Sequence, residues 1–162
     1  AHTNLERAPA RDAGDEVKAR YYDEHAPKKP VPSASLFFSA PLVARNGAHL
    51  EPGDLLAGVD DDSATAAAVH AYDVDRAAFI SLFAVGAALE LTSTASTVAT
   101  IALLPKDPKA SAYVFVGGRV VELAGFGAML AGWLLFGRDS IDKRDEAFND
   151  YDADLRAHLG LE

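Results

Sequence analysis

The sequence predicts an all-α membrane protein built around an antiparallel hairpin of two transmembrane helices. Two long stretches, residues 77–104 and 112–137, hold nearly all of the apolar runs, whereas the charged residues gather before and after them. The segment that joins the two stretches, residues 105–111, contains two prolines and is too short to traverse a bilayer. The two spans are therefore expected to be antiparallel neighbours, with both chain termini on one side of the membrane.

The overall composition hides this segregation. Of the 162 residues, 49% are hydrophobic and 24% are charged, and the formal net charge is −9 at pH 7. Such an acidic chain is not expected to bind nucleic acid or an anionic lipid surface, because both attract basic clusters. The chain has no cysteine, which excludes a disulfide framework, a thiolate metal site and a cysteine nucleophile.

Residues 1–62 are predicted to form an N-terminal arm that is mostly extended. Within it, residues 12–25 (DAGDEVKARYYDEH) are expected to form a short helix, and the prolines that follow favour a polyproline-like chain. Phe37 and Phe38 come next without a core of their own. They are predicted to dock on a partner, and the alternative is a disordered arm with an isolated apolar patch.

The chain between the arm and the first span is predicted to change from loop to helix. Residues 46–47 (NG) predict a turn, and residues 51–62 (EPGDLLAGVDDD) predict a loop. An Ala-rich helix over residues 63–76 is expected to follow, with Ser63 as its N-cap. This helix is expected to continue into the first span without a break.

Both spans have the length that a membrane requires. At 1.5 Å per residue, residues 77–104 and residues 112–137 are each long enough to cross a hydrocarbon core of about 30 Å. The alternative is a pair of core helices in a soluble bundle. Such helices would show a polar stripe and would be nearer to the usual length of about 11 to 12 residues.

Three charged side chains fall inside the spans. Glu90 lies near the middle of the first span, roughly 21 Å from either end, and Arg119 and Glu122 are neighbours on the second. Folding the hairpin about its turn brings the three to similar depth, so an inward-facing Glu90–Arg119–Glu122 cluster is expected. It either pins the register of the helices or carries a proton, an ion or a ligand contact, because intramembrane ionisable groups are functional candidates.

Small residues are expected to bring the two helices close together. The second span carries a row of Ala124, Ala128 and Gly132 at four-residue spacing, and the first has one small, polar face. The opposite face of the first span, with Leu82, Val85 and Leu89, is expected to meet lipid. The predicted packing residues are Gly86, Ser93, Thr97, Gly118, Gly125, Ala128 and Gly132.

Residues 138–162 are predicted to form an acidic amphipathic helix that stops at Gly160. An apolar face on this helix must pack on the N-terminal region, on a partner or at the membrane surface. The many acidic residues make an anionic membrane surface the least favourable of these. Phe148, Tyr151 and Leu155 are therefore predicted to dock on a partner.

The last half of the chain resembles a small type of bacterial envelope protein. Proteins of that type, common in gliding and predatory bacteria, have a Gly/Ala-rich transmembrane hairpin and a tail similar to D-A-I/V-x-x-Y-N-x-x-L. Residues 146–155 (EAFNDYDADL) resemble this tail, with Asp152 where the pattern has Asn. The resemblance implies a membrane hairpin but no defined biochemical activity.

The sequence contains no recognisable catalytic, metal or cofactor site. The five histidines are far apart, with no pair at the i, i+4 spacing of helical metal ligands. Residues 60–62 (DDD) lack the alternating ligands and the glycine of a calcium loop. Several hydroxyls lie between Thr92 and Thr100, but no histidine is near enough in sequence to activate one as a nucleophile.

These observations predict a non-enzymatic accessory or scaffold subunit of a larger membrane complex. Its partners would be other membrane protein subunits and the lipid bilayer, with no nucleic acid and no cofactor. Two alternatives stay open. One is an oligomeric hairpin that conducts protons or ions through Glu90 or Glu122, and the other is a stand-alone envelope protein.

The basic residues around the spans predict an orientation. Lysine and arginine are more frequent on the side of the termini than in the turn, so the positive-inside rule places both termini in the cytoplasm or its organellar equivalent. The residues on the terminal side are Arg76, Arg138, Lys143 and Arg144, and those in the turn are Lys106 and Lys109.

Overall fold

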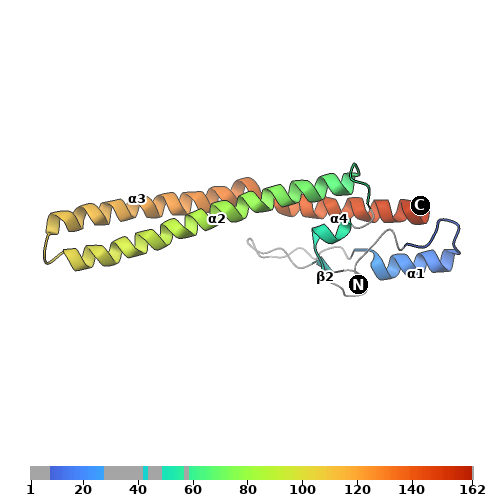
Figure 1. The fold of residues 1–162 in the computed structure, drawn as a ribbon, viewed down its shortest axis with the longest axis horizontal. Helices are drawn as coiled ribbons and strands as arrows, with labels where there is room; N and C mark the ends of the chain where they lie inside the picture. The colour runs from blue at the N-terminus through green and yellow to red at the C-terminus, as the bar shows by residue number, and fades with distance from the viewer. Residues whose placement is uncertain (1–7, 28–41, 44–48, 57–58, 162) are drawn as a thin grey trace. The chain divides into compact units, whose positions relative to one another are not determined.

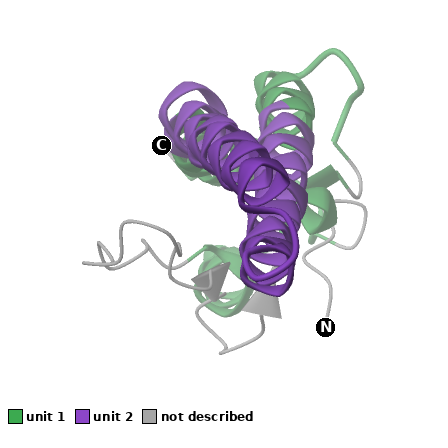
Figure 2. Ribbon diagram, turned by 90° about the vertical axis from the view of Figure 1, so that its left-hand side faces the viewer, with its two compact units in different colours: residues 1–74, 139–162 green, residues 75–138 purple. Residues whose placement is uncertain are grey.

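The structure, a computed structural model, describes residues 8–27, 42–43, 49–56 and 59–161, and these are almost entirely helical (Figure 1). The chain divides into two compact units (Figure 2). Unit 1 comprises Ala1–Val74 and Asp139–Glu162, and unit 2 comprises Asp75–Arg138. In chain order the elements are helix α1 (Asp15–His25), strands β1 (Leu42–Val43) and β2 (His49–Leu50), the 3-10 helix η2 (Pro52–Leu56), helices α2 (Ala64–Leu103) and α3 (Pro108–Gly132), the π-helix η3 (Trp133–Gly137) and helix α4 (Arg138–Leu159).

Two helices in the described part of the chain are long and apolar enough to cross a membrane, as the sequence predicts. One is α2, with 40 residues, and the other is the continuous helix from Pro108 to Leu159, with 52 residues. Both are longer than the predicted spans, because the helix predicted at 63–76 runs into the first span and α4 continues from the second. The π-helix η3 lies between α3 and α4 and keeps the chain helical through that junction.

The connection between α2 and α3 is shorter than predicted. Helix α3 begins at Pro108, so the predicted turn 105–111 is wrong in its second half. The Asp107 carboxylate accepts hydrogen bonds from the backbone N–H groups of Lys109 and Ala110, at 3.1 and 3.0 Å. Pro108 is at the first helical position, where its fixed φ suits a helix and its missing N–H costs nothing. An Asp-Pro pair therefore starts the helix earlier than the apolar pattern does.

The N-terminal arm contains more regular structure than predicted. Helix α1 forms inside the predicted range 12–25, and η2 replaces the beginning of the predicted loop 51–62. Strands β1 and β2 pair antiparallel, with Leu42 opposite Leu50 and Val43 opposite His49. The predicted turn at 46–47 and the predicted docking residues Phe37 and Phe38 lie outside the described residues.

Two predicted helix ends agree with the structure. The Ser63 Oγ accepts a hydrogen bond from the Ala66 backbone N–H at 3.0 Å, so Ser63 caps the start of α2. At the end of α4, Gly160 has a φ of 67°, which a glycine adopts without strain. The Leu161 N–H then bonds back to the Arg156 carbonyl oxygen at 2.9 Å, which closes the helix.

The apolar face of α4 forms the core of unit 1, which corrects the prediction that Phe148, Tyr151 and Leu155 dock on a partner. These three side chains are at most 3% exposed. They are covered by the chain itself, because the N-terminal region and the start of α2 contribute apolar residues to the same cluster. Around them the buried core consists of Ala26, Leu55, Ala68, Val69, Ala147 and Leu159.

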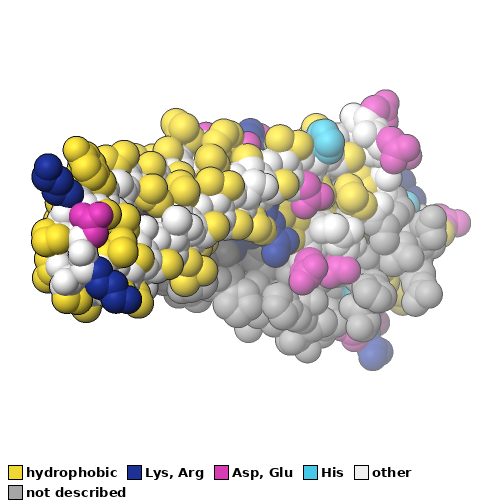
Figure 3. Space-filling model, turned by 60° about the vertical axis from the view of Figure 1, so that its left-hand side comes forward, with side chains coloured by type: hydrophobic (Ala, Val, Ile, Leu, Met, Phe, Trp, Pro, Cys, Tyr) yellow, Lys and Arg dark blue, Asp and Glu magenta, His cyan; other side chains and the backbone are white. Residues whose placement is uncertain are grey.

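Unit 2 has the opposite distribution of apolar groups. Its large hydrophobic side chains are mostly on the outside, and they cover most of the helix surface visible in Figure 3. Leu91, Leu123 and Tyr113 are 73%, 72% and 80% exposed. A water-soluble unit would turn such residues inward.

Candidate functional site

The site lies on the two helices of unit 2, and a row of small residues on α3 determines how they meet. Residues of α2 contact residues of α3 in reverse numerical order: Ser96 lies against Gly118, and Leu82 lies against Gly132. The buried residues of α3 are Ser111, Gly118, Gly125 and Gly132, each seven positions after the last. Seven-residue spacing keeps one helix face on its neighbour along the whole length of the contact.

Each residue of this row lies next to a backbone oxygen of α2. The Ser111 hydroxyl donates to the Thr100 carbonyl oxygen at 2.9 Å. A Cβ placed on each of the three glycines would come within 4 Å of a carbonyl oxygen, namely that of Ser93 for Gly118 (3.8 Å), Gly86 for Gly125 (2.9 Å) and Phe79 for Gly132 (3.6 Å). The helices therefore approach backbone to backbone, which only small residues permit.

Most of the predicted packing residues lie in this interface. Gly86, Ser93, Gly118, Gly125 and Gly132 are buried, whereas Thr97 and Ala128 are only partly buried. The expectation that Leu82, Val85 and Leu89 face lipid is wrong for the two leucines, whereas Val85 is 53% exposed. The Cβ atoms of the leucines lie 2.9 and 3.0 Å from where a Cβ on Gly132 or Gly125 would stand, so both leucines flank the small residues at the contact.

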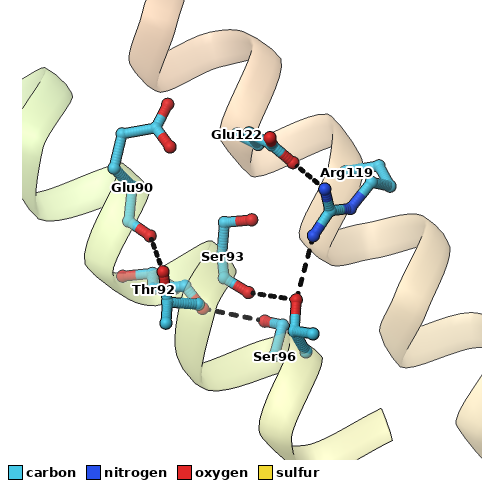
Figure 4. A network of polar contacts seen from close by, with 8 residues as sticks. Glu90, Thr92, Ser93, Ser96, Arg119 and Glu122 are labelled. Carbon is cyan, nitrogen blue, oxygen red and sulfur yellow. Dashed lines mark hydrogen bonds and ion pairs between the residues drawn. The ribbon is translucent and has the colours of Figure 1, made fainter.

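Polar side chains of both helices, here called the polar notch, come together near the middle of the pair (Figure 4). We use this name for Glu90 and Thr97 on α2 with Arg119 and Glu122 on α3. Arg119 forms an ion pair with Glu122, one helical turn away, and donates a hydrogen bond to the Thr97 hydroxyl on α2 at 2.9 Å. Its guanidinium also lies 5.4 Å from the centre of the Phe115 ring, within the range of a cation–π contact.

The expected three-residue cluster forms only in part, because Arg119 joins one of the two carboxylates. In Figure 4 no interaction reaches the Glu90 carboxylate, and it makes no ion pair or hydrogen bond with a described residue. One of its oxygens would lie 3.1 Å from a Cβ on Gly125, so the side chain extends towards α3. The Nε of Arg119 is buried and also lacks a hydrogen-bond partner within the described part of the chain.

Five hydroxyls of α2 in and near the notch are already engaged. Those of Thr92, Thr94, Ser96, Thr97 and Thr100 each donate to the carbonyl oxygen four residues earlier, at 2.8 to 3.1 Å. Such bonds satisfy a hydroxyl inside an apolar environment. None of these five hydroxyls donates to the Glu90 carboxylate.

A second polar network, in unit 1, was not predicted from the sequence. Tyr22 on α1 donates to the Asp152 carboxylate at 2.6 Å, and Arg156 donates to the Tyr22 oxygen at 2.9 Å and to Asp152 at 3.0 Å. Burial and the bond to Asp152 raise the pKa of Tyr22. The network ties α1 to α4, and Thr65 on α2 adds a 2.7 Å hydrogen bond to Asp154. It has no sequence signature, because Tyr22 and Asp152 are 130 positions apart.

The metal-binding potential of the described residues is low. No group of three or more His, Cys, Asp or Glu side chains comes together among them in a way that would hold a metal ion. Among the described residues, the polar notch is the strongest candidate site, because it places charged side chains in the middle of two apolar helices.

Comparison with known proteins leaves the function to be argued from this geometry. The chain matches no protein-family model, no curated protein and no solved structure.

Proposed function

We propose that the chain is a non-enzymatic accessory subunit of a larger membrane complex, and that α2 and α3 cross the bilayer as an antiparallel hairpin. One observation carries the proposal: a half-exposed ion pair sits in the middle of a surface that, Glu90 apart, is otherwise free of charge and mostly apolar. The Arg119 and Glu122 side chains are 43% and 39% exposed. Charges at the centre of a bilayer are costly and normally face protein, so another protein surface is expected to cover them.

The dimensions of the helix pair support a position across the bilayer. Tyr113, near the start of α3, and Trp133, the first residue of η3, lie near the two ends of the second apolar span, where interfacial aromatic residues are usual. Their 20-residue separation corresponds to about 30 Å along a helix, the thickness of a typical hydrocarbon core. Only 11% of the most apolar stretch of α2 is buried within the chain, and lipid would cover the remainder.

The proposed orientation has unit 1 and both termini on the cytoplasmic side or its organellar equivalent. Its support is the excess of basic residues at the terminal ends of the helices over the two lysines of the connection. Protease added to sealed, right-side-out vesicles should leave α4 intact, and disruption of the vesicles should expose it. Cleavage of α4 in intact vesicles would contradict this orientation.

A second candidate function is conduction of protons or ions by a ring of such hairpins. It is favoured by the Glu90 carboxylate, which has no partner among the described residues although it lies at mid-span. The Arg119–Glu122 pair argues against it, because a fixed guanidinium next to the pathway repels cations.

Mild-detergent extraction of the native protein, followed by measurement of the mass of the extracted particle, separates the candidates. An accessory subunit should migrate with other polypeptides in fixed ratio, whereas a conducting ring should contain copies of this chain alone. A single chain in its detergent micelle would support a stand-alone envelope protein. Extraction at alkaline pH tests insertion independently, because a spanning hairpin stays with the lipid.

A further inference from the structure

The charge of the polar notch is unbalanced. Residues 77–104 and 112–137 contain two carboxylates, Glu90 and Glu122, and one guanidinium, Arg119, so the net charge of the spans is −1. Arg119 is committed to Glu122 and Thr97. The excess negative charge therefore rests on Glu90.

Glu90 lies on the same partly exposed face of α2 as Thr97. Phe83, Glu90 and Thr97 are seven residues apart and hence share one face of α2. Thr97 receives the hydrogen bond from Arg119, so this is the face towards which α3 presents its charged pair. A helix lying along that face would contact Glu90 and Arg119 together.

Aromatic side chains border the notch. Phe83, Phe115 and Phe126 are 45%, 46% and 60% exposed, and each lies about two helical turns or fewer from a charged member of the notch. A polar centre with an apolar border is the arrangement by which an interface excludes the surrounding solvent from its central contact. In a bilayer that solvent is lipid, and the aromatic border would keep lipid away from the charged side chains.

We propose that the notch binds a transmembrane helix of another protein that carries one lysine or arginine at mid-bilayer depth. The partner's cation would pair with Glu90 and bring the net charge of the buried cluster to zero. The inference rests on the proposed membrane position and adds to it the chemistry of the partner.

A second copy of this chain fits the notch less well than a basic helix does. Each copy brings a net charge of −1 at this depth, so two copies facing each other would bury −2. Like charges that are not neutralised repel strongly in an environment of low dielectric constant. Charge complementarity therefore favours a partner of different sequence.

The experiment uses the full chain in zwitterionic vesicles, labelled with a donor fluorophore on α4. The probes are acceptor-labelled synthetic helices of about 20 leucine and alanine residues, the length of a span, with lysine, leucine or glutamate at the centre. Energy transfer as a function of peptide-to-lipid ratio gives the affinity of each probe. The lysine helix is expected to bind roughly tenfold more tightly than the leucine helix, which is about 1.4 kcal/mol. The glutamate helix should bind no better than the leucine helix.

The decisive variant is Glu90→Gln, which should remove the preference for lysine. Glu90 makes no side-chain bond with the described residues, so the variant is expected to fold, and circular dichroism checks that it does. Leu91→Ala is the matched control, because Leu91 is the next residue in sequence, is 73% exposed and lies away from the notch, so its loss should leave the preference unchanged.

Three results would overturn the inference. Equal binding of the lysine and leucine helices would mean that Glu90 is protonated or inaccessible. A lysine preference that survives in Glu90→Gln would place the contact elsewhere. Energy transfer between two labelled copies of this chain, abolished by Glu90→Gln, would make a second copy the occupant. Alkaline extraction of the same vesicles separates these results from failure of the proposed function, because only a chain that does not insert contradicts both.

Discussion

The carbonyl oxygen of Gly86 lies 2.9 Å from the point at which a Cβ on Gly125 would stand, closer than Cβ atoms come to other atoms in proteins. Gly125→Ala therefore requires the backbone of α2 to move away, and it should lower the free energy of unfolding by about 1–3 kcal/mol. The change is measured by reversible denaturation in mixed micelles. Gly127→Ala is the control, since a Cβ at Gly127 meets nothing within 4 Å. Equal effects of the two substitutions would mean that α2 does not pack on Gly125.

Removal of Arg119 should destabilise the helix pair through the carboxylate that it leaves behind. Arg119→Leu deprives Glu122 of its partner, and breaking a buried pair in this way costs up to about 3–5 kcal/mol. The partial exposure of this pair places the expected loss below that range. Arg119→Leu combined with Glu122→Gln should recover most of the stability, because Glu122 is then no longer a carboxylate that has lost its partner. A double variant as unstable as the single one would show that Arg119 acts through Thr97 or Phe115 instead.

Truncation of Leu155 should destabilise unit 1 even in the isolated chain, where no partner protein is present. This side chain is fully buried, and Leu155→Ala is expected to cost about 2–5 kcal/mol. Hydrogen exchange in α1 and α4 of the isolated chain should rise, while exchange in α3 should not change. Val17→Ala, at a position 56% exposed, serves as the control and should have little effect. If hydrogen exchange in the Leu155→Ala chain were unchanged but the chain no longer joined its membrane complex, α4 would have to dock on a partner after all.

Asp150 should make unit 1 less stable at neutral pH than at acid pH. Burial, followed by the charges of Glu146 and Asp154, raises the pKa of Asp150 in the folded chain. A raised pKa means that folding favours the protonated carboxyl of Asp150. Its stabilising contribution is therefore fully present below about pH 4 and is lost as the pH rises through the raised pKa. Asp150→Asn should thus stabilise the protein at pH 7 by a few tenths of a kcal/mol, about the size of a like-charge helical pair. The gain should vanish near pH 3, and a gain that persists there would exclude an electrostatic origin.

The elements that could be predicted are those determined by local patterns. Long apolar runs predict the two candidate spans, a serine before an Ala-rich run predicts the cap at Ser63, and Gly160 ends α4 as expected. The apolar face of α4 is also evident from its period, although what covers it is not. The start of α3 was missed because Asp107 and Pro108 set it, ahead of the apolar pattern.

The rotation of the helices could not be predicted. Gly117 and Gly118 are equivalent in composition and depth, yet a Cβ on Gly118 would meet Ser96 whereas one on Gly117 would meet nothing within 4 Å. The four-residue row that ends at Gly132 is present in the sequence, but the buried row has seven-residue spacing. The depth of Glu90 could be predicted from its place in the span, but its partner could not. Arg119 was expected to pair with both carboxylates, and it pairs with Glu122 alone.

The backbone oxygens that face the small residues of α3 have an evolutionary consequence. A carbonyl oxygen stays in place when the side chain of its residue changes, so a partly exposed position such as Thr100 is free to accept other helix-compatible residues. The row from Ser111 to Gly132 has no such freedom, because any larger side chain would separate the backbones. Divergent versions of this hairpin should therefore differ most at the exposed positions of α2, while preserving Gly86 and the seven-residue interval of small residues on α3. That interval would identify them when residue identity no longer does.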